Sequence, residues 1–343
     1  MAENKDYNVE TPAISVILAT RGDKVDFLKN CIESLKNQKF RNFEIIVVSK
    51  KFPEQLEDLF EREHISFVEE KGSTLGAARN LGVRNAKAKL VSFIDDDAEA
   101  SADWLDKISM TFSRFPSLCC LGGPHFTLQD KSEKDPLKYV EGLFFEGNSQ
   151  KIYLDKSAIG KIAGCNVTYK SDVFQEIGYL NENLKTCEDW DFNRRLMEKG
   201  CSLRFDPEIW VLHHRQGLKH AFQNSVKTAP FYLSWKTFKL SSSESLFAYF
   251  YGTNLLFILL LVILFISPCF FLLVFVSFLI GYVAFTAVRT HTYDHRVFYF
   301  PLAILFTLAR ILGFYFGLIK YAALKLHNLF ARSAPLAEHS PSS

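Results

Sequence analysis

The sequence predicts an α/β domain with a Rossmann-like, mostly parallel sheet and helices on both faces, followed by an α-helical transmembrane region. Short apolar runs alternate with segments of helical spacing between Ile14 and Gly123, the pattern of strands joined by crossover helices. The composition then changes near Ser243, and no charged residue lies between Glu244 and Arg289. We expect these two parts to fold in different solvents, water and a lipid bilayer.

Four strands and three helices are expected in the first part. The apolar runs typical of buried parallel strands are Ile14–Ala19, Phe43–Val48, Ile65–Val68 and Leu90–Ile94. Helical spacing occurs over 26–37, around Leu56–Phe60 and from Gly72 toward Ala86, where Ser73 or Thr74 is the expected N-cap. Ligands of such sheets bind beyond the carboxyl ends of the strands, so the polar residues at those ends should share one cleft.

The segment from Pro124 to Ala158 has no clear period, and we interpret it as a loop over this cleft. The elements expected after it are a strand over 162–169, a helix capped by Ser171 that ends at Ile177, a helix that begins around 187–191, and short strands at 203–205 and 209–212.

Charge and cysteine content restrict the class of protein. Lys and Arg number 40 and Asp and Glu 38, so no basic excess indicates nucleic-acid binding. The seven cysteines show no C-x-x-C spacing, which fits free thiols in a reducing compartment. The polar N-terminus shows no signal peptide. We therefore expect the α/β domain to be cytoplasmic.

The uncharged run Ser245–Val288 would be roughly 66 Å long as one helix. A bilayer core is about 30 Å thick, so the run predicts two spans that turn at Ser267–Pro268. A buried helical hairpin in a water-soluble core is the alternative. A third apolar stretch, Val297–Ile319, contains Arg310, which either lies mid-membrane with a function or marks a shallow or tilted segment.

These observations predict a multi-pass protein of the cell membrane. The expected parts are a disordered N-terminus (1–12), the α/β domain (13–217), an interfacial amphipathic linker (218–243), a membrane region with two to three helices (244–330) and a disordered tail (331–343).

The run Asp95–Asp97 directly follows the fourth expected strand. Adjacent carboxylates repel one another unless a cation offsets their charge. A divalent cation at a strand end is suited to binding a diphosphate. The alternative is a solvated acidic turn at the start of a helix.

Several motifs together resemble the family 2 glycosyltransferases, which have the GT-A fold. The resemblance extends from about Ile14 to Arg215, and its pieces are ISVILATRGD, NFEIIVV, GSTLGAARNLGVRNAKAKLVSFIDDD, GCNVTYKSDVFQEIGYLNENL, CEDWDFNRRL and VLHHR. The resemblance implies transfer of a sugar from a nucleotide diphosphate sugar to an acceptor, with inversion at the anomeric carbon.

By this resemblance, Asp95 and Asp97 are the acids of the D-x-D motif and Asp96 is its variable middle position. Asp97 would bind Mg²⁺ or Mn²⁺, while Asp95 would face the ribose or the metal. His213 or His214 would complete the metal coordination, and we favour His213 because it directly follows the apolar run. A structural histidine is the alternative.

The stretch Glu188–Asp191 matches the family's E-D-x-D element. The resemblance gives Asp189 the role of the base that accepts the proton of the acceptor hydroxyl, as inverting transfer requires. Glu188 would shape the pocket or hold an acceptor hydroxyl. Alternatively, both acids only complement a helix N-terminus.

The resemblance also implies contacts with the nucleotide sugar. Ser49 stands where the family often has an Asp, which leaves the identity of the base open. The residues expected at the nucleotide sugar are Thr20, Arg21, Ser49, Arg79, Asn80, Asp95, Asp96, Gly164 and Asn166.

The expected function is transfer of one sugar to a lipid-linked acceptor at the cytoplasmic face of a bilayer. The Q-x-x-R-W signature of processive relatives is not present, which favours single-sugar transfer. A polyprenyl- or dolichyl-phosphate hexose synthase and a non-catalytic nucleotide-sugar-binding scaffold are the alternatives.

Overall fold

The computed structural model describes residues 11–72, 74–127, 152–154, 158, 162–214, 218–232, 309, 312–317, 319–321 and 323–324. The chain divides into two compact units. The first comprises Met1–Arg215 with Ser243–Tyr249, and the second comprises Gln216–Ser242 with Phe250–Ser343. Each unit is described by itself.

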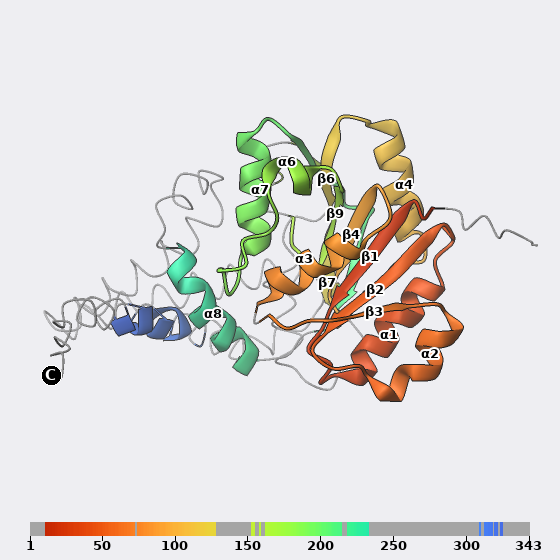
Figure 1. Ribbon diagram of the computed structural model, residues 1–343. Coiled ribbons are helices and arrows are strands. Elements are labelled where there is room, and N and C mark those ends of the chain that lie inside the picture. Colours follow the sequence, from red (N-terminus) through yellow and green to blue (C-terminus); the bar gives the residue numbers. More distant parts are fainter. Residues whose placement is uncertain are drawn as a thin grey trace, which may run out of the picture. The chain divides into compact units, whose positions relative to one another are not determined.

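The first unit is built on an eight-stranded sheet in the order β3-β2-β1-β4-β9-β6-β10-β8. Its strands are β1 (Ile14–Ala19), β2 (Phe43–Ser49), β3 (Ser66–Glu69), β4 (Leu90–Ile94), β6 (Leu118–Gly122), β8 (Tyr153–Leu154), β9 (Asn166–Lys170) and β10 (Ser202–Phe205). Strands β3, β2, β1 and β4 are parallel neighbours, and Figure 1 shows them side by side. Strand β9 is antiparallel to both β4 and β6. A second sheet, in the order β5-β11-β7, contains β5 (Ala98–Ala100), β7 (His125–Thr127) and β11 (Val211–His213).

Helices cover both faces of the larger sheet. They are α1 (Val25–Lys36), α2 (Glu57–Arg62, after the 3-10 turn Glu54–Leu56), α3 (Leu75–Asn85), α4 (Trp104–Arg114), α6 (Val173–Ile177) and α7 (Glu188–Glu198). On one face, Val16 and Leu18 of β1 belong to the same buried cluster as Ile32 of α1. On the other face, Gly82 of α3 lies so close to Ile17 that a Cβ on Gly82 would be 2.5 Å from Ile17 Cγ2.

The α/β architecture is therefore confirmed, and the four early strands lie within one residue of the expected bounds. Thr74 is the N-cap of α3, because its side chain accepts a hydrogen bond from the Ala77 N–H at 3.2 Å. Three predicted boundaries were wrong. Strand β9 begins at Asn166 because residues 163–166 form a turn, in which the Asn166 N–H donates to the Ala163 carbonyl.

The other two boundaries are those of α6 and β11. Helix α6 has Asp172, not Ser171, as its N-cap. Strand β11 begins at Val211 rather than at residue 209. Strand β7 lies at the start of the segment interpreted as a loop over the cleft, and most of the rest of that segment lies outside the described residues.

The second unit contains α8 (Leu218–Tyr232), a helix within the segment expected to be an interfacial amphipathic linker. A Cβ on Gly313 would be 2.5 Å from the Phe222 carbonyl oxygen, so the segment around Gly313 crosses α8 closely. Among the described residues, no helix has both the length and the apolar character needed to span a bilayer. The uncharged run 245–288 and most of the stretch 297–319 lie outside those residues.

Candidate active site

The carboxyl ends of β1, β2 and β4 bring their polar residues together, as expected from neighbouring parallel strands. The Thr20 hydroxyl donates a hydrogen bond to the Asp96 carboxylate. The Gly22 N–H donates to Thr20 Oγ1 at 3.0 Å, and a Cβ on Gly22 would be 3.1 Å from Ser49 Oγ. Gly22 has a φ of +74°, which favours glycine. Arg21, between Thr20 and Gly22, is exposed at this edge.

The small sheet places His213 beside the aspartates. Strand β11 pairs antiparallel with β5, so His213 lies opposite Ala98. Its Nε2 is 3.3 Å from Asp97 Oδ1 and 3.6 Å from Asp95 Oδ2. His214 instead places its Nε2 2.7 Å from Glu99 Oε1. The two histidines therefore have different surroundings, and His213 is the one at the aspartates.

The pKa values of Asp95 and Asp96 are shifted in opposite directions. Burial would raise the pKa of Asp95, but its contact with His213 and the charge of Arg79 lower it to about 2. Burial raises the pKa of Asp96 to about 6, with the charges of Asp97 and Asp95 adding to the rise against the Thr20 hydrogen bond. At neutral pH, Asp95 is thus fully ionised.

Arg79 of α3 is a buried cation with three acceptors. It donates to Glu188 Oε1 at 2.7 Å, to Asp95 Oδ1 at 2.8 Å and to the Gly164 carbonyl at 2.9 Å. Burial opposes the charge of Arg79, but Asp95 and Glu188 raise its pKa above the ordinary value. Burial raises the pKa of Glu188, and Asp189 adds to the rise while Arg79 opposes it. The Glu188 carboxylate is only 3% exposed and binds Arg79, so we interpret its role as positioning rather than contact with an acceptor.

Asp189 accepts hydrogen bonds from two backbone groups. Its Oδ2 accepts from the Gly164 N–H at 2.6 Å, and its Oδ1 accepts from the Trp190 N–H at 2.8 Å. Because the Gly164 carbonyl accepts from Arg79, one peptide segment links Asp189 to the cation that also binds Asp95. A Cβ on Gly164 would be 2.3 Å from Arg79 Nη1, so only glycine allows this approach.

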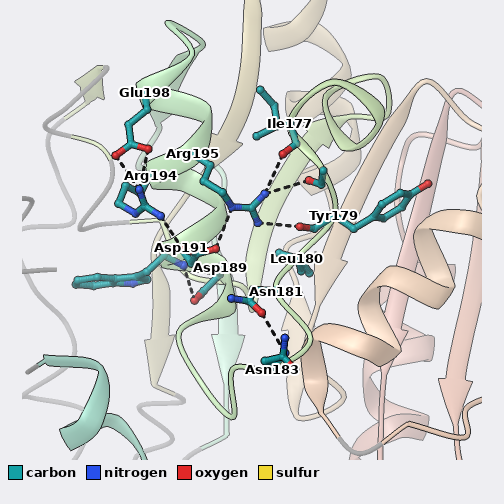
Figure 2. Close-up of polar contacts among 12 residues, drawn as sticks. Ile177, Tyr179, Leu180, Asn181, Asn183, Asp189, Asp191, Arg194, Arg195 and Glu198 are labelled. Atoms are coloured by element: carbon teal, nitrogen blue, oxygen red, sulfur yellow. Dashed lines mark hydrogen bonds and ion pairs between the residues drawn. The ribbon is translucent and has the colours of Figure 1, made fainter. Parts of the chain in front are cut away.

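The position of helix α7 is set by the backbone just before it and by hydrogen bonds from its Arg195 side chain. Cys187, just before it, has a φ of +62°, an uncommon conformation for a residue with a Cβ that lets the helix start with Glu188 and Asp189. Figure 2 shows Arg195 extending from α7 to the segment that contains Ile177 and Tyr179. Arg195 donates to the Tyr179 carbonyl at 2.8 Å and to Asp191 Oδ2 at 2.9 Å. These hydrogen bonds tie α7, which begins with Glu188 and Asp189, to the segment that contains Tyr179.

Two residues expected at the nucleotide sugar have structural roles instead. Asn80 donates to the Leu180 carbonyl and to Glu182 Oε1, and its Oδ1 accepts from the Leu180 N–H. The Asn166 amide donates to the carbonyls of Pro124 and Ile209, and its Oδ1 accepts from the Trp104 indole. Both side chains are at most 1% exposed. Both N–H bonds of each amide are donated within the protein and each oxygen already accepts one hydrogen bond, so neither side chain has a donor left for a sugar.

Cys165 is a site residue that the sequence analysis missed. Its thiol, the Asp95 carboxylate and the His213 imidazole offer donor atoms that all lie within 4.8 Å of one another. The one signal in the sequence was its position between Gly164 and Asn166, two residues that the resemblance assigned to the sugar.

A comparison with known families decides the class of this domain. Residues 15–178 match the family model described as glycosyl transferase family 2. The chain contains a glycosyl transferase family 2 domain. This family 2 domain includes the aspartates, Arg79 and Gly164, whereas Glu188, Asp189 and His213 follow the matched residues.

Curated relatives of the family 2 domain are glycosyltransferases by name. An uncharacterized glycosyltransferase, MJ1057, of Methanocaldococcus jannaschii is 25% identical over 67% of this chain and 80% of its own length. The pre-mycofactocin glycosyltransferase of Mycobacterium tuberculosis is 27% identical over 42% of this chain and 31% of its own. The chain spans 31%, 37% and 64% of the first three curated relatives that it matches.

Among solved structures, Staphylococcus aureus TarS is similar, with a TM-score of 0.47 and 15% identity over 64% of this chain and 40% of that chain.

The metal-binding side chains of the family 2 domain, together with His213 beyond the matched residues, fit a divalent cation. The site offers two carboxylates and an imidazole, those of Asp95, Asp97 and His213. One oxygen of each carboxylate lies within 3.6 Å of the imidazole Nε2. The lowered pKa of Asp95 keeps one of these ligands ionised at neutral pH. Carboxylates suit both Mg²⁺ and Mn²⁺, whereas an imidazole ligand favours Mn²⁺ over Mg²⁺.

Proposed function

We propose that the chain is an inverting glycosyltransferase, which moves one sugar from a nucleotide diphosphate sugar to a lipid-linked acceptor at the cytoplasmic face of a membrane. The observation that carries this proposal is the linked pair of acidic centres. Asp95 contacts Arg79, Arg79 contacts the Gly164 carbonyl, and the Gly164 N–H contacts Asp189. A donor centre and an acceptor centre next to each other are what a direct displacement requires.

At the donor centre, Asp97 and His213 would hold Mg²⁺ or Mn²⁺, with Asp95 in contact with the ion or the ribose. The bound cation would offset the charge that develops on the leaving diphosphate. Thr20, Arg21 and Ser49 stand at the adjoining strand ends, where the nucleotide would bind. Arg21 is exposed there and can offer its guanidinium to a phosphate oxygen.

At the acceptor centre, Asp189 would take the proton from the acceptor hydroxyl as that oxygen attacks the anomeric carbon. The N–H groups of Gly164 and Trp190 each bind one Asp189 oxygen, which fixes the orientation of the carboxylate. Each oxygen keeps a further lone pair for the proton. Glu188 accepts a hydrogen bond from Arg79 and so helps to keep Arg79, and through it the Gly164 segment, in position.

A membrane acceptor is proposed from the sequence. The uncharged run 245–288 is long enough for two spans, and α8 precedes it with apolar and basic residues interleaved. Anchored in this way, the domain would stay close to an acceptor that cannot leave the bilayer.

The test is sugar transfer from a panel of nucleotide sugars into membrane lipids by the full chain with Mn²⁺. Asp189→Asn should lower the turnover rate by about 10²- to 10⁴-fold, because general-base catalysis contributes that much. Glu198→Gln is the matched control, since Glu198 lies on the same helix with its side chain 61% exposed. We expect it to retain the wild-type rate.

Other outcomes of the same assay separate the alternatives. A lipid phosphate as acceptor needs little deprotonation, so a small effect of Asp189→Asn would favour a polyprenyl-phosphate hexose synthase. Absence of turnover with every donor would contradict the proposed function and favour a nucleotide-sugar-binding scaffold.

A further inference from the structure

We propose that Cys165 is a further ligand of the metal site, and that the site therefore also binds a borderline transition-metal ion such as Zn²⁺ or Co²⁺ through the Cys165 thiolate, the Asp95 carboxylate and the His213 imidazole. The proposal rests on the proposed function in one respect: it takes the cluster of Asp95, Cys165 and His213 as the ion site of the transferase. It adds a third type of donor to the carboxylates and the imidazole.

The fold brings the three donors together from separate segments. Strands β4 and β9 are antiparallel, and Ile94 lies opposite Asn166. The residue that follows Ile94 and the residue that precedes Asn166 are Asp95 and Cys165, which therefore meet where the two strands end. His213 reaches the same point from β11 of the smaller sheet.

The spacing of the donors suits a tetrahedral ion. Zn–N and Zn–O bonds of about 2.1 Å give an edge of about 3.4 Å between two ligand atoms, and a Zn–S bond of about 2.3 Å lengthens that edge slightly. His213 Nε2 lies 3.6 Å from Asp95 Oδ2. The donor atoms of Asp95, Cys165 and His213 all lie within 4.8 Å of one another, so small side-chain movements suffice.

The surroundings orient Asp95 for this role. Its Oδ1 binds Arg79 at 2.8 Å, which directs its Oδ2 toward His213. Such outer contacts fix ligand orientation in metal sites. Cys165 is 7% exposed, so its thiol faces the protein interior near this point rather than bulk water. On binding the ion, the thiol would release its proton to solvent and coordinate as thiolate.

The donor chemistry predicts which ion is favoured. Mg²⁺ prefers oxygen ligands and gains little from sulfur, whereas Zn²⁺ and Co²⁺ bind thiolate and imidazole well. Loss of the Cys165 thiol should thus weaken Zn²⁺ and Co²⁺ binding while Mg²⁺ binding changes little.

The test is a titration of the full-length protein with Co²⁺, followed by absorption spectroscopy, and then displacement by Zn²⁺. We expect a thiolate-to-cobalt charge-transfer band in the near ultraviolet for the wild type, and its loss in Cys165→Ser. Zn²⁺ affinity should fall at least about tenfold in this variant.

Cys31→Ser is the matched control. Cys31 is fully buried, and its thiol contacts the Asp95 backbone carbonyl at 3.5 Å, yet it is outside the donor cluster. It should keep the cobalt band, and serine can keep the hydrogen bond. Circular dichroism of each variant checks that it folds.

The proposal would be overturned by Co²⁺ bound to the wild type without a charge-transfer band, or by a band unchanged in Cys165→Ser. The first of these results is measured on the wild type, so the proposal can be tested even if Cys165→Ser does not fold. Failure to bind Co²⁺ at all would overturn it too. Since the readout does not involve sugar transfer, a cobalt band without transferase activity would contradict the proposed function alone.

Discussion

Arg79 and Arg84 lie on the same helix but differ in their surroundings. Arg79 is 3% exposed and pairs with two carboxylates. Arg84 is half exposed and lies 3.5 Å from Glu182. Arg79→Gln should therefore destabilise the fold by about 3–5 kcal/mol, because it leaves Asp95 and Glu188 without their buried cation. Arg84→Gln should cost less than about 1 kcal/mol.

Urea unfolding of both variants, followed by tryptophan fluorescence, measures this difference. Equal changes in the free energy of unfolding would contradict the assignment of Arg79 as the organising cation of the site.

Asp96 gives a second prediction at the residue scale. Its pKa is raised by burial from the ordinary 3.8 to about 6, so the folded protein retains a proton that the unfolded chain releases between these values. The contribution of Asp96 to stability is thus present below pH 3.8 and lost as pH rises toward 6. Asp96→Asn should be more stable than wild type at pH 7 by about 1–3 kcal/mol, with little difference near pH 3.8.

Urea unfolding across this pH range, in the presence of a chelator, tests the prediction. Parallel stability curves for wild type and variant would show that Asp96 does not carry a raised pKa.

Single residues also show where sequence reasoning stops. The sheet pattern predicted that Asp95 and Asp97 lie at a strand end. The expectation that His213 lies beside them came from the family resemblance and from its position after an apolar run. Asn80 and Asn166 have the same side-chain chemistry whether they bind a ligand or the backbone. Only the structure reveals that their partners are protein groups far away in sequence.

At the scale of elements, helix α3 packs on β1 through a glycine. A Cβ on Gly82 would be 2.5 Å from Ile17 Cγ2, and Ile17 is buried in the sheet. Gly82→Ala should destabilise the fold by about 1–2 kcal/mol, because overpacking exceeds the gain in helix propensity. In Gly76→Ala, on the same helix, the new Cβ would lie 3.4 Å from the nearest atom, so this control should be neutral or slightly stabilising.

Thermal unfolding of the two variants distinguishes them. A stabilised Gly82→Ala protein would mean that α3 does not pack against Ile17 as closely as described.

Local patterns predicted the early elements but not the insertion of β9 between β4 and β6. An apolar run has the same pattern whether its strand is parallel or antiparallel to its neighbours. Nothing local to residues 166–170 specifies that β9 is antiparallel to both β4 and β6. Strands β5 and β7 are three residues each, too short for a periodic signal, yet they pair with β11, the strand that carries His213.

At the scale of the whole molecule, the uncharged run 245–288 predicts integral membrane association. The full chain expressed in cells should remain in the membrane pellet after alkaline carbonate extraction. A variant that lacks residues 244–330 should be released. Recovery of the full chain in the supernatant would contradict the proposed anchor and favour a buried hairpin.

The central claim is direct displacement at the anomeric carbon with Asp189 as the base. The measurement that tests it most directly is the anomeric configuration of the transferred sugar, determined by NMR from the coupling of the anomeric proton in the isolated product. The account predicts a configuration opposite to that of the sugar in the donor nucleotide. A product that retains the donor configuration would contradict it.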